Sequence, residues 1–121
     1  MKKQKSGRIV NIGSVASRNG GSYAGVHYAA SKGGVLALTK NLAKELGQFG
    51  ICVNGVNPGP SLTHMTESWP EEMRANIIKN TPSRRLAIPE DIAKAVLFLS
   101  SEKASFINGE TIEVNGGLLC D

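Results

Sequence analysis

The chain has 121 residues, of which 40% are hydrophobic and 20% are charged, and its formal net charge is +4. This length suits one domain with one core and is too short for two. The basic residues have no aromatic residues interleaved with them, which argues against a nucleic-acid surface, and no apolar run is long enough to span a membrane.

No metal or redox site is expected from the cysteines and histidines. Cys52 and Cys120 are far apart and belong to no CxxC pair, so they indicate neither a zinc site nor a redox pair. His27 and His64 have no carboxylate or cysteine at metal-ligand spacing. Reduced thiols fit a cytoplasmic protein, and the apolar run IVNI is too short for the core of a signal peptide. We therefore expect a cytoplasmic location.

The first predicted element is a β-strand at residues 8–13, where RIVNIG is rich in β-branched residues. The stretch that follows, SVASRNGGSYAG, is rich in Ser and Gly, so a loop is predicted there.

A long helix is predicted at residues 24–46, where the apolar side chains follow helical spacing, and Gly47 or Gly50 can end it. Gly33 and Gly34 each cost this helix roughly 1 kcal/mol relative to Ala. We expect the close approach of another segment to be the reason for them.

The second half of the chain is predicted to contain two strands and two helices. ICVNGVNPG at residues 51–59 predicts a strand that breaks at its Pro-Gly pair, and GETIEVNGG predicts another at residues 110–114. Ser68 and Glu71 have capping-box spacing, which predicts a short helix after them. Trp69, at the start of that helix, is a candidate to line a substrate lid, with a core or interface role as the alternative.

A further helix is predicted to open at Pro89, with acidic residues in its first turn that suit the helix dipole. Its apolar residues are predicted to face a core; they are Ile92, Ala93, Val96, Leu97 and Leu99. The element order, strand, helix, strand, helices, strand, predicts one α/β unit with a parallel sheet and right-handed crossovers.

The stretch HYAASKGG places Tyr28 and Lys32 four residues apart, on one face of a helix. A free phenol has a pKa of about 10, too high for a useful base at neutral pH. An ammonium about 4 Å from a phenolate stabilises it by roughly 4 kcal/mol, or about 3 pK units, at an effective dielectric of about 20. Such a pair is a candidate for general acid-base catalysis.

Four motifs, in this order and spacing, resemble the C-terminal half of the short-chain dehydrogenase/reductases. The likeness is greatest to the 3-oxoacyl-(acyl carrier protein) reductase and glucose dehydrogenase branches. It implies the C-terminal half of a doubly wound Rossmann-type parallel sheet, with about three strands and flanking helices. The motifs are NIGS at 11–14, YAASK at 28–32, NPGPSLT at 57–63 and the closing GETIEVNGG.

The resemblance implies roles for three residues in hydride transfer between NAD or NADP and a carbonyl or alcohol carbon. Tyr28 matches the catalytic acid-base, and Lys32 matches the residue that acts on it and binds the nicotinamide ribose. Ser14 matches the serine that holds the substrate oxygen. Ser17 is a weaker competitor for that role.

The resemblance also implies a cofactor-binding loop, with Pro58, Gly59, Ser61 and Thr63 as its contact residues. Thr63 would reach the carboxamide or the pyrophosphate. A simple turn at the end of the strand is the alternative for Pro58 and Gly59. Ser61 stands where the family usually has Ile or Val, and Gly13 stands where many members have a second serine.

The sequence lacks the features that would bind the rest of a dinucleotide. No glycine-rich turn of the GxGxxG or TGxxxGxG kind lies between a strand and a helix. We therefore expect residues 1–121 to be a single partial Rossmann-type domain without the N-terminal dinucleotide-binding half. The adenosine ribose is read by that half, so the sequence leaves open the choice between NAD and NADP.

Two functions remain open. The first is an NAD(P)-dependent oxidoreductase acting on a small carbonyl or alcohol substrate such as a 3-oxoacyl thioester. The second is an inactive truncated paralogue that works as an assembly module, because the predicted strand at residues 8–13 would leave an open edge. Either way a homo-oligomer or a complex with a full-length relative is expected, with no nucleic-acid or membrane partner.

Overall fold

The computed structural model describes residues 1–120. Its parallel sheet contains β1 (Gly7–Ile12), β2 (Ile51–Pro58) and β3 (Thr111–Val114), in the order β1-β2-β3. The register sets Gly7 opposite Ile51 and Gly55 opposite Thr111. All three predicted strands are confirmed to within one residue at each end, as is the predicted α/β class.

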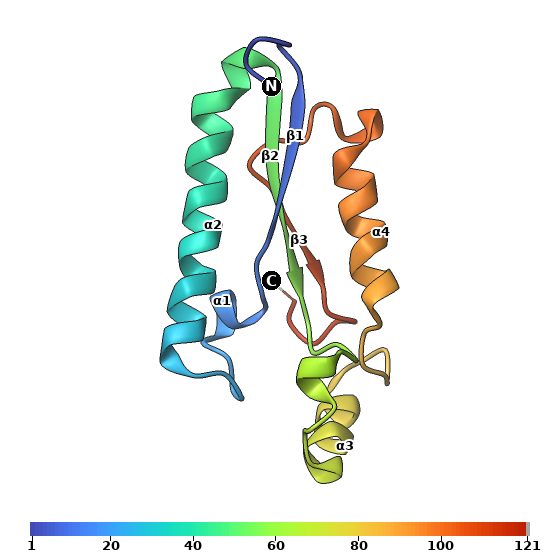
Figure 1. The fold of residues 1–121 in the computed structure, drawn as a ribbon. Coiled ribbons are helices and arrows are strands. Elements are labelled where there is room, and N and C mark those ends of the chain that lie inside the picture. Colours follow the sequence, from blue (N-terminus) through green and yellow to red (C-terminus); the bar gives the residue numbers. More distant parts are fainter. Residues whose placement is uncertain (121) are drawn as a thin grey trace.

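Helices connect the strands (Figure 1). The first connection contains α1 (Ala16–Asn19), α2 (Val26–Leu46) and η1 (Gly47–Phe49). The second contains η2 (His64–Thr66), α3 (Glu71–Asn80), α4 (Pro89–Ser100) and η3 (Glu102–Ala104). Within residues 1–120, no helix combines the length and the apolar character needed to cross a membrane.

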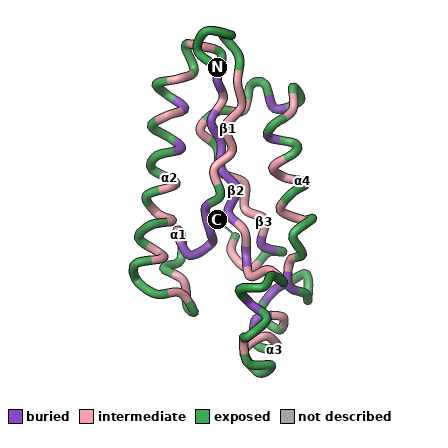
Figure 2. Tube along the Cα trace, in the orientation of Figure 1, coloured by how far each residue is buried: buried purple, intermediate pink, exposed green. Residues whose placement is uncertain are grey.

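Two hydrophobic clusters hold α2 and α4 on opposite faces of the sheet. Ile9 and Val53 pack in the cluster that includes α2, whereas Val10 and Val56 pack in the cluster that includes α4. Neighbouring residues of a strand point to opposite faces, which agrees with this division. Figure 1 shows the two helices on either side of the strands, and Figure 2 shows buried residues along the central strand β2.

This arrangement corrects the prediction of right-handed crossovers. The chain moves from β1 to β2 to β3 in one direction across the sheet, yet α2 and α4 lie on opposite faces. Two parallel crossovers that do this have opposite hands, so only one of them is right-handed. The second connection runs through α3 before it reaches α4. Strand twist favours a right-handed connection when the crossover is compact. The additional helix α3 makes the second crossover longer, so strand twist has less influence on its hand.

Two local predictions are wrong. The predicted loop after β1 contains the single helical turn α1, which ends at Gly20 in a left-handed conformation with φ 78°. The capping box from Ser68 does not form, because Pro70 occupies the N-cap position of α3 and makes no side-chain cap. Glu71 instead lies in the first turn, where its charge suits the helix dipole.

The predicted inner face of α4 is partly wrong. Leu99 is fully buried and Ile92 and Val96 pack beside it, but Leu97 is 73% exposed and Ala93 is also exposed. Residues 92, 96 and 99 share one stripe at helical spacing, and residues 93 and 97 lie about 100° further round the helix.

The glycine pair of α2 has no close neighbour among the described residues. A Cβ at Gly33 or Gly34 would meet no heavy atom within 4 Å. The expected close approach is therefore absent among residues 1–120, because no other described element lies against that part of the helix surface.

We predict that Leu99→Ala lowers the free energy of unfolding by about 2–5 kcal/mol, because it removes a fully buried side chain between α4 and the sheet. Leu97→Ala on the same helix is the matched control and should change it by less than about 0.5 kcal/mol. Urea unfolding followed by circular dichroism measures both. Equal losses would contradict the packing described for α4.

Candidate active site

The carboxyl ends of β1 and β2 open into a pocket of about 700 Å³. Parallel strands bring their carboxyl ends to one edge of a sheet, so the segments that follow β1 and β2 meet there. The start of α2 reaches the same edge (Figure 1). All seven residues singled out from the sequence line this pocket: Ser14, Tyr28, Lys32, Pro58, Gly59, Ser61 and Thr63.

Tyr28 and Lys32 lie one helical turn apart near the start of α2, both half-buried. The Lys32 ammonium lies 5.8 Å from the centroid of the Tyr28 ring. It also donates to the carbonyl oxygen of Ile12, at 2.9 Å. An ammonium has three N–H donors, so the bond to Ile12 fixes its place and leaves others for a ligand.

Ser14 lies two residues after the end of β1. It is buried in the wall of the pocket. Its backbone N–H donates to Asn57 Oδ1 at 3.1 Å, and its Oγ accepts from the N–H of Ala16 at 3.1 Å. Its hydroxyl hydrogen can therefore be directed into the pocket. Ser17, the competing serine, donates its hydroxyl to the Ser14 carbonyl at 2.5 Å and does not line the pocket.

The loop after β2 is held by the neighbouring strand ends. Val15 N–H donates to Pro58 O at 3.1 Å, and Gly59 N–H donates to Val114 O at 2.9 Å. A Cβ at Gly59 would lie 2.9 Å from Asn115 Cα, so backbone packing alone requires a glycine there. The loop is thus a strand-ending turn that also lines the pocket.

Ser61 and Thr63 serve the loop's internal structure as well. The Ser61 hydroxyl donates to Gly59 O at 2.9 Å, so this serine turns back into the loop where an apolar residue would project. Thr66 Oγ1 donates to Ser61 O at 2.6 Å and accepts from Thr63 N–H at 3.0 Å. These bonds give the loop from 59 to 66 a defined shape.

The opposite wall of the pocket joins the loop before α2 to α3. Asn76 Nδ2 donates to the hydroxyl of Tyr23 at 3.0 Å. Tyr23 lines the pocket, and Trp69 lines it as the predicted lid position would. No local pattern predicts the Tyr23–Asn76 contact, because it joins residues 53 apart.

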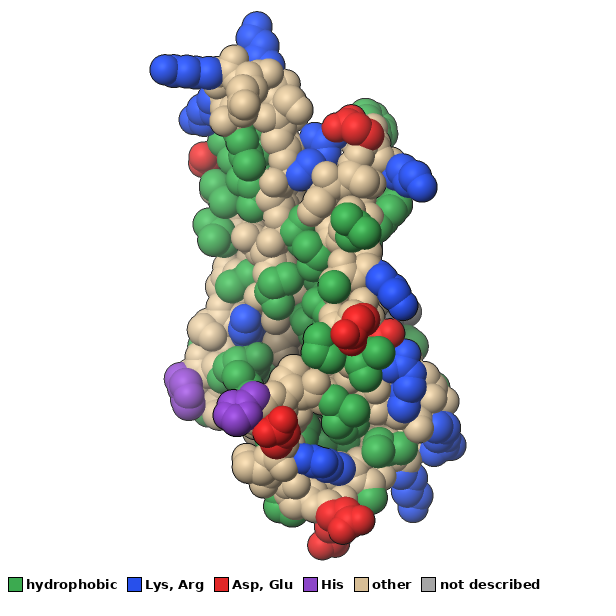
Figure 3. All heavy atoms as spheres, turned by 45° about the vertical axis from the view of Figure 1, so that its right-hand side comes forward, with side chains coloured by type: hydrophobic (Ala, Val, Ile, Leu, Met, Phe, Trp, Pro, Cys, Tyr) green, Lys and Arg blue, Asp and Glu red, His purple; other side chains and the backbone are tan. Residues whose placement is uncertain are grey.

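The two histidines add no metal site. His27 lines the pocket, while the His64 side chain is 99% exposed and pairs with Glu67 at 3.0 Å. Figure 3 shows histidine side chains on the surface in the lower half of the molecule. The carboxylate of Glu67, one turn along from His64 at η2, is its ion-pair partner. Even so, no group of three or more potential ligands occurs among residues 1–120.

A family model described as enoyl-(acyl carrier protein) reductase matches residues 1–119. The chain belongs to the short-chain dehydrogenase/reductase family.

Curated relatives in this family are 3-oxoacyl-(acyl-carrier-protein) reductases and similar enzymes. The chain is 48% identical over 118 residues to FabG, the 3-oxoacyl-(acyl-carrier-protein) reductase of Haemophilus influenzae, covering 98% of this chain and 48% of that protein. It is 46% identical over 118 residues to an acetoacetyl-CoA reductase of an Acinetobacter species, covering 98% and 47%. The chain therefore spans about half the length of the curated relatives it matches.

Solved structures give the same result for the fold. A 3-oxoacyl-(acyl-carrier protein) reductase from Brucella melitensis superposes with a TM-score of 0.96 at 39% identity, over 100% of this chain and 45% of that one. A structure from Beutenbergia cavernae, provisionally named an NAD(P)-dependent gluconate 5-dehydrogenase and carrying NADP at low occupancy, superposes with a TM-score of 0.95 at 39% identity, over 100% and 49%.

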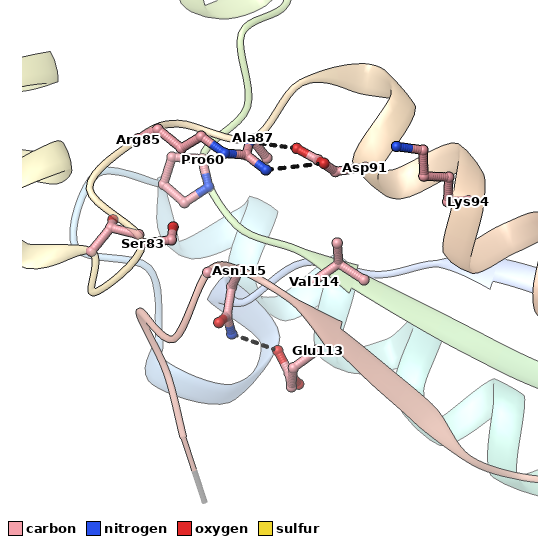
Figure 4. A pocket seen from close by; sticks show the side chains of 11 residues that line it. Pro60, Ser83, Arg85, Ala87, Asp91, Lys94, Glu113, Val114 and Asn115 are labelled. Carbon is pink, nitrogen blue, oxygen red and sulfur yellow. Dashed lines mark hydrogen bonds and ion pairs between the residues drawn. The ribbon is translucent and has the colours of Figure 1, made fainter.

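This short-chain dehydrogenase/reductase chain has a second, smaller pocket of about 320 Å³ between α4 and the end of β3 (Figure 4). On one side of this pocket Arg85 donates to both carboxylate oxygens of Asp91, at 2.6 and 3.1 Å. Asp91 also accepts from the N–H of Ile88 at 2.9 Å, which caps the start of α4. The hydrogen bond from Arg85 and then that from Ile88 lower the pKa of Asp91 from 3.8 to about 2.

We predict that Arg85→Met raises the pKa of Asp91 toward its usual 3.8, because the largest cause of its depression is removed. In the parent chain the ionised carboxylate stabilises the fold fully above about pH 4, and this contribution is lost as the pH falls toward 2. Carboxyl ¹³C NMR titration measures the pKa. Arg84→Met is the control, since Arg84 donates to the Lys79 carbonyl instead. An unchanged Asp91 pKa in Arg85→Met would refute the assignment.

Proposed function

We propose that this chain carries the reactive half of an NAD(P)-dependent oxidoreductase, which moves a hydride between a nicotinamide cofactor and a carbonyl or alcohol carbon. The observation that carries the proposal is the gathering of Ser14, Tyr28 and Lys32 with the 58–63 loop in one pocket. The pocket lies at the carboxyl edge of a parallel sheet, the usual ligand position in such folds.

The chemistry of the pocket fits the nicotinamide and ribose end of the cofactor. The Lys32 ammonium has donors for ribose hydroxyls, and Pro58 and Val15 offer apolar surface to a ring. Thr63, at the exposed end of the loop, supplies polar groups for the carboxamide or the pyrophosphate. When bound there, the nicotinamide would supply or accept the hydride.

The chain's own residues would then manage the proton and the developing charge. The Tyr28 hydroxyl gives its proton to the carbonyl oxygen during reduction and takes it back during oxidation. The Ser14 hydroxyl donates a hydrogen bond to the same oxygen, where negative charge develops. Lys32, beside the Tyr28 ring and anchored on Ile12, would hold the ribose next to the reacting groups with its remaining N–H donors.

A 3-oxoacyl thioester is the substrate class that we favour. The relatives from Haemophilus influenzae and Acinetobacter are named for acyl-carrier-protein and CoA thioesters of this kind. The part of the pocket that lies between α3 and the loop preceding α2 has room for a small acyl group beside Ser14 and Tyr28.

We also propose that the protein is cytoplasmic. It would work there as a homo-oligomer or bound to a full-length relative.

The adenosine end of the cofactor would be held outside this pocket. No described strand is followed by a glycine-rich turn and helix of the kind that binds a pyrophosphate. We therefore propose that residues 1–121 form a partial Rossmann-type domain, and that this chain alone binds NADH or NADPH weakly and turns over little or nothing.

We predict that Tyr28→Phe lowers the rate of acetoacetyl-CoA reduction, measured by NADPH absorbance, by roughly 10²-fold or more, because the proton donor is lost. Tyr23→Phe is the matched control, since it removes a hydroxyl from the same pocket and should change the rate only a few-fold. Equal losses in the two variants would contradict the role of Tyr28. A parent rate of 1–10³ s⁻¹, on the order of typical complete enzymes, would contradict the partial-site proposal.

A second candidate function is that of an assembly module, and the sheet edge favours it. Among the described strands β1 pairs with β2 alone, so its other side offers backbone groups to another chain. Ile12 on this strand is also 43% exposed. A partner strand laid along β1 would cover both.

Association through this edge predicts a concentration-dependent dimer or larger species in sedimentation velocity. Mixing with a full-length relative should also shift the chain to a faster-sedimenting complex. A single monomeric species at high concentration, unchanged by the relative, would remove the assembly module from consideration.

A further inference from the structure

The side chain of Asn57 joins the carboxyl ends of all three strands. Asn57 lies at the end of β2 and is fully buried. Its Oδ1 accepts from the backbone N–H of Ser14, after β1, at 3.1 Å. Its Nδ2 donates to Glu113 Oε1, on β3, at 2.8 Å.

The chemistry of the two partners fixes the orientation of this amide. A backbone N–H can only donate, so Ser14 requires the oxygen of Asn57. An ionised carboxylate can only accept, so Glu113 requires the nitrogen. The reversed amide would lose both bonds in a buried place, which is costly.

Gly13 is explained by the same side chain. A Cβ added at Gly13 would collide with Asn57 Oδ1. The serine that many family members have at this position would displace the amide from Ser14. Gly13 and Asn57 are therefore structurally coupled, and the glycine leaves room for the bond to Ser14.

Glu113 is itself held in place from two further elements. Arg18 on α1 lies 3.6 Å from Glu113 Oε1, and Asn115 Nδ2 donates to Oε2 at 3.3 Å. Figure 4 shows the Asn115–Glu113 bond at the end of β3. The carboxylate thus provides a fixed acceptor on which the Asn57 amide can be oriented.

We propose that Asn57 and Glu113 are positioning residues for Ser14. Glu113 orients the Asn57 amide, which holds the Ser14 backbone, while Ala16 N–H holds the Ser14 oxygen. The hydroxyl of Ser14 is left to donate to the substrate oxygen. The claim that this positioning assists catalysis rests on the proposed function. The claim that Asn57 holds the Ser14 backbone is independent of it.

Hydrogen exchange of the Ser14 amide in the ¹⁵N-labelled chain tests the holding step. Asn57→Leu should accelerate this exchange about tenfold, because the buried acceptor is lost. The double variant Asn57→Asp with Glu113→Gln reverses the donor and acceptor between residues 57 and 113 and keeps the net charge. It should restore the Ser14 exchange to within about threefold of the parent chain. Gly13 N–H, which donates to Val56 O at 2.8 Å, is the internal control.

Equal acceleration at Ser14 and Gly13 in Asn57→Leu, or no recovery at Ser14 in a folded double variant, would overturn the proposal. The kinetic arm uses acetoacetyl-CoA reduction: Asn57→Leu should lower kcat about tenfold with KM nearly unchanged, and the double variant should recover kcat. Unchanged kcat in Asn57→Leu would overturn the catalytic part. If the parent chain shows no turnover, binding of a nicotinamide ligand in the pocket decides the proposed function, and the exchange result still decides whether Asn57 holds Ser14.

Discussion

The pairing of β2 with a parallel strand on each side is the constraint on which the rest of this structure depends. It brings three strand ends to one edge, and every catalytic candidate is fixed relative to that edge. Ser14 follows β1, Pro58 ends β2, and Gly59 is packed against Asn115 after β3. Loops alone would leave such groups mobile, whereas here Gly13 and Val15 on either side of Ser14 donate to Val56 and Pro58, and Gly59 donates to Val114.

Packing of α2 on one face of the sheet brings the remaining groups to this edge. Thr39 and Ala43 are the buried residues of the helix, and their packing fixes its position against the strands. Tyr28 and Lys32 then lie at its start, and the bond from Lys32 to Ile12 joins that start to the end of β1. The site is therefore assembled from a helix start and strand ends that local sequence could not bring together without the sheet.

The sequence predicted those features that depend on local chemistry. β-branched runs and the Pro-Gly break predicted the three strands, and the family resemblance predicted seven residues that line one pocket. Local sequence patterns could not predict features that depend on which helix and strand surfaces pack together. The hand of the second crossover and the exposure of Leu97 are two examples. The Asn57–Glu113 bond is another, because it joins residues 56 apart in the sequence and arises only when β2 and β3 pair.

The most direct test of the central claim, that this pocket binds the reactive end of a nicotinamide cofactor, is an NMR titration of the ¹⁵N-labelled chain with reduced nicotinamide mononucleotide. We predict saturable shifts at millimolar ligand for the amides of Ser14, Lys32 and residues 59–63, and no shifts there with adenosine monophosphate. Shifts confined to the smaller pocket at Arg85 and Asp91, or equal responses to both ligands, would contradict the claim.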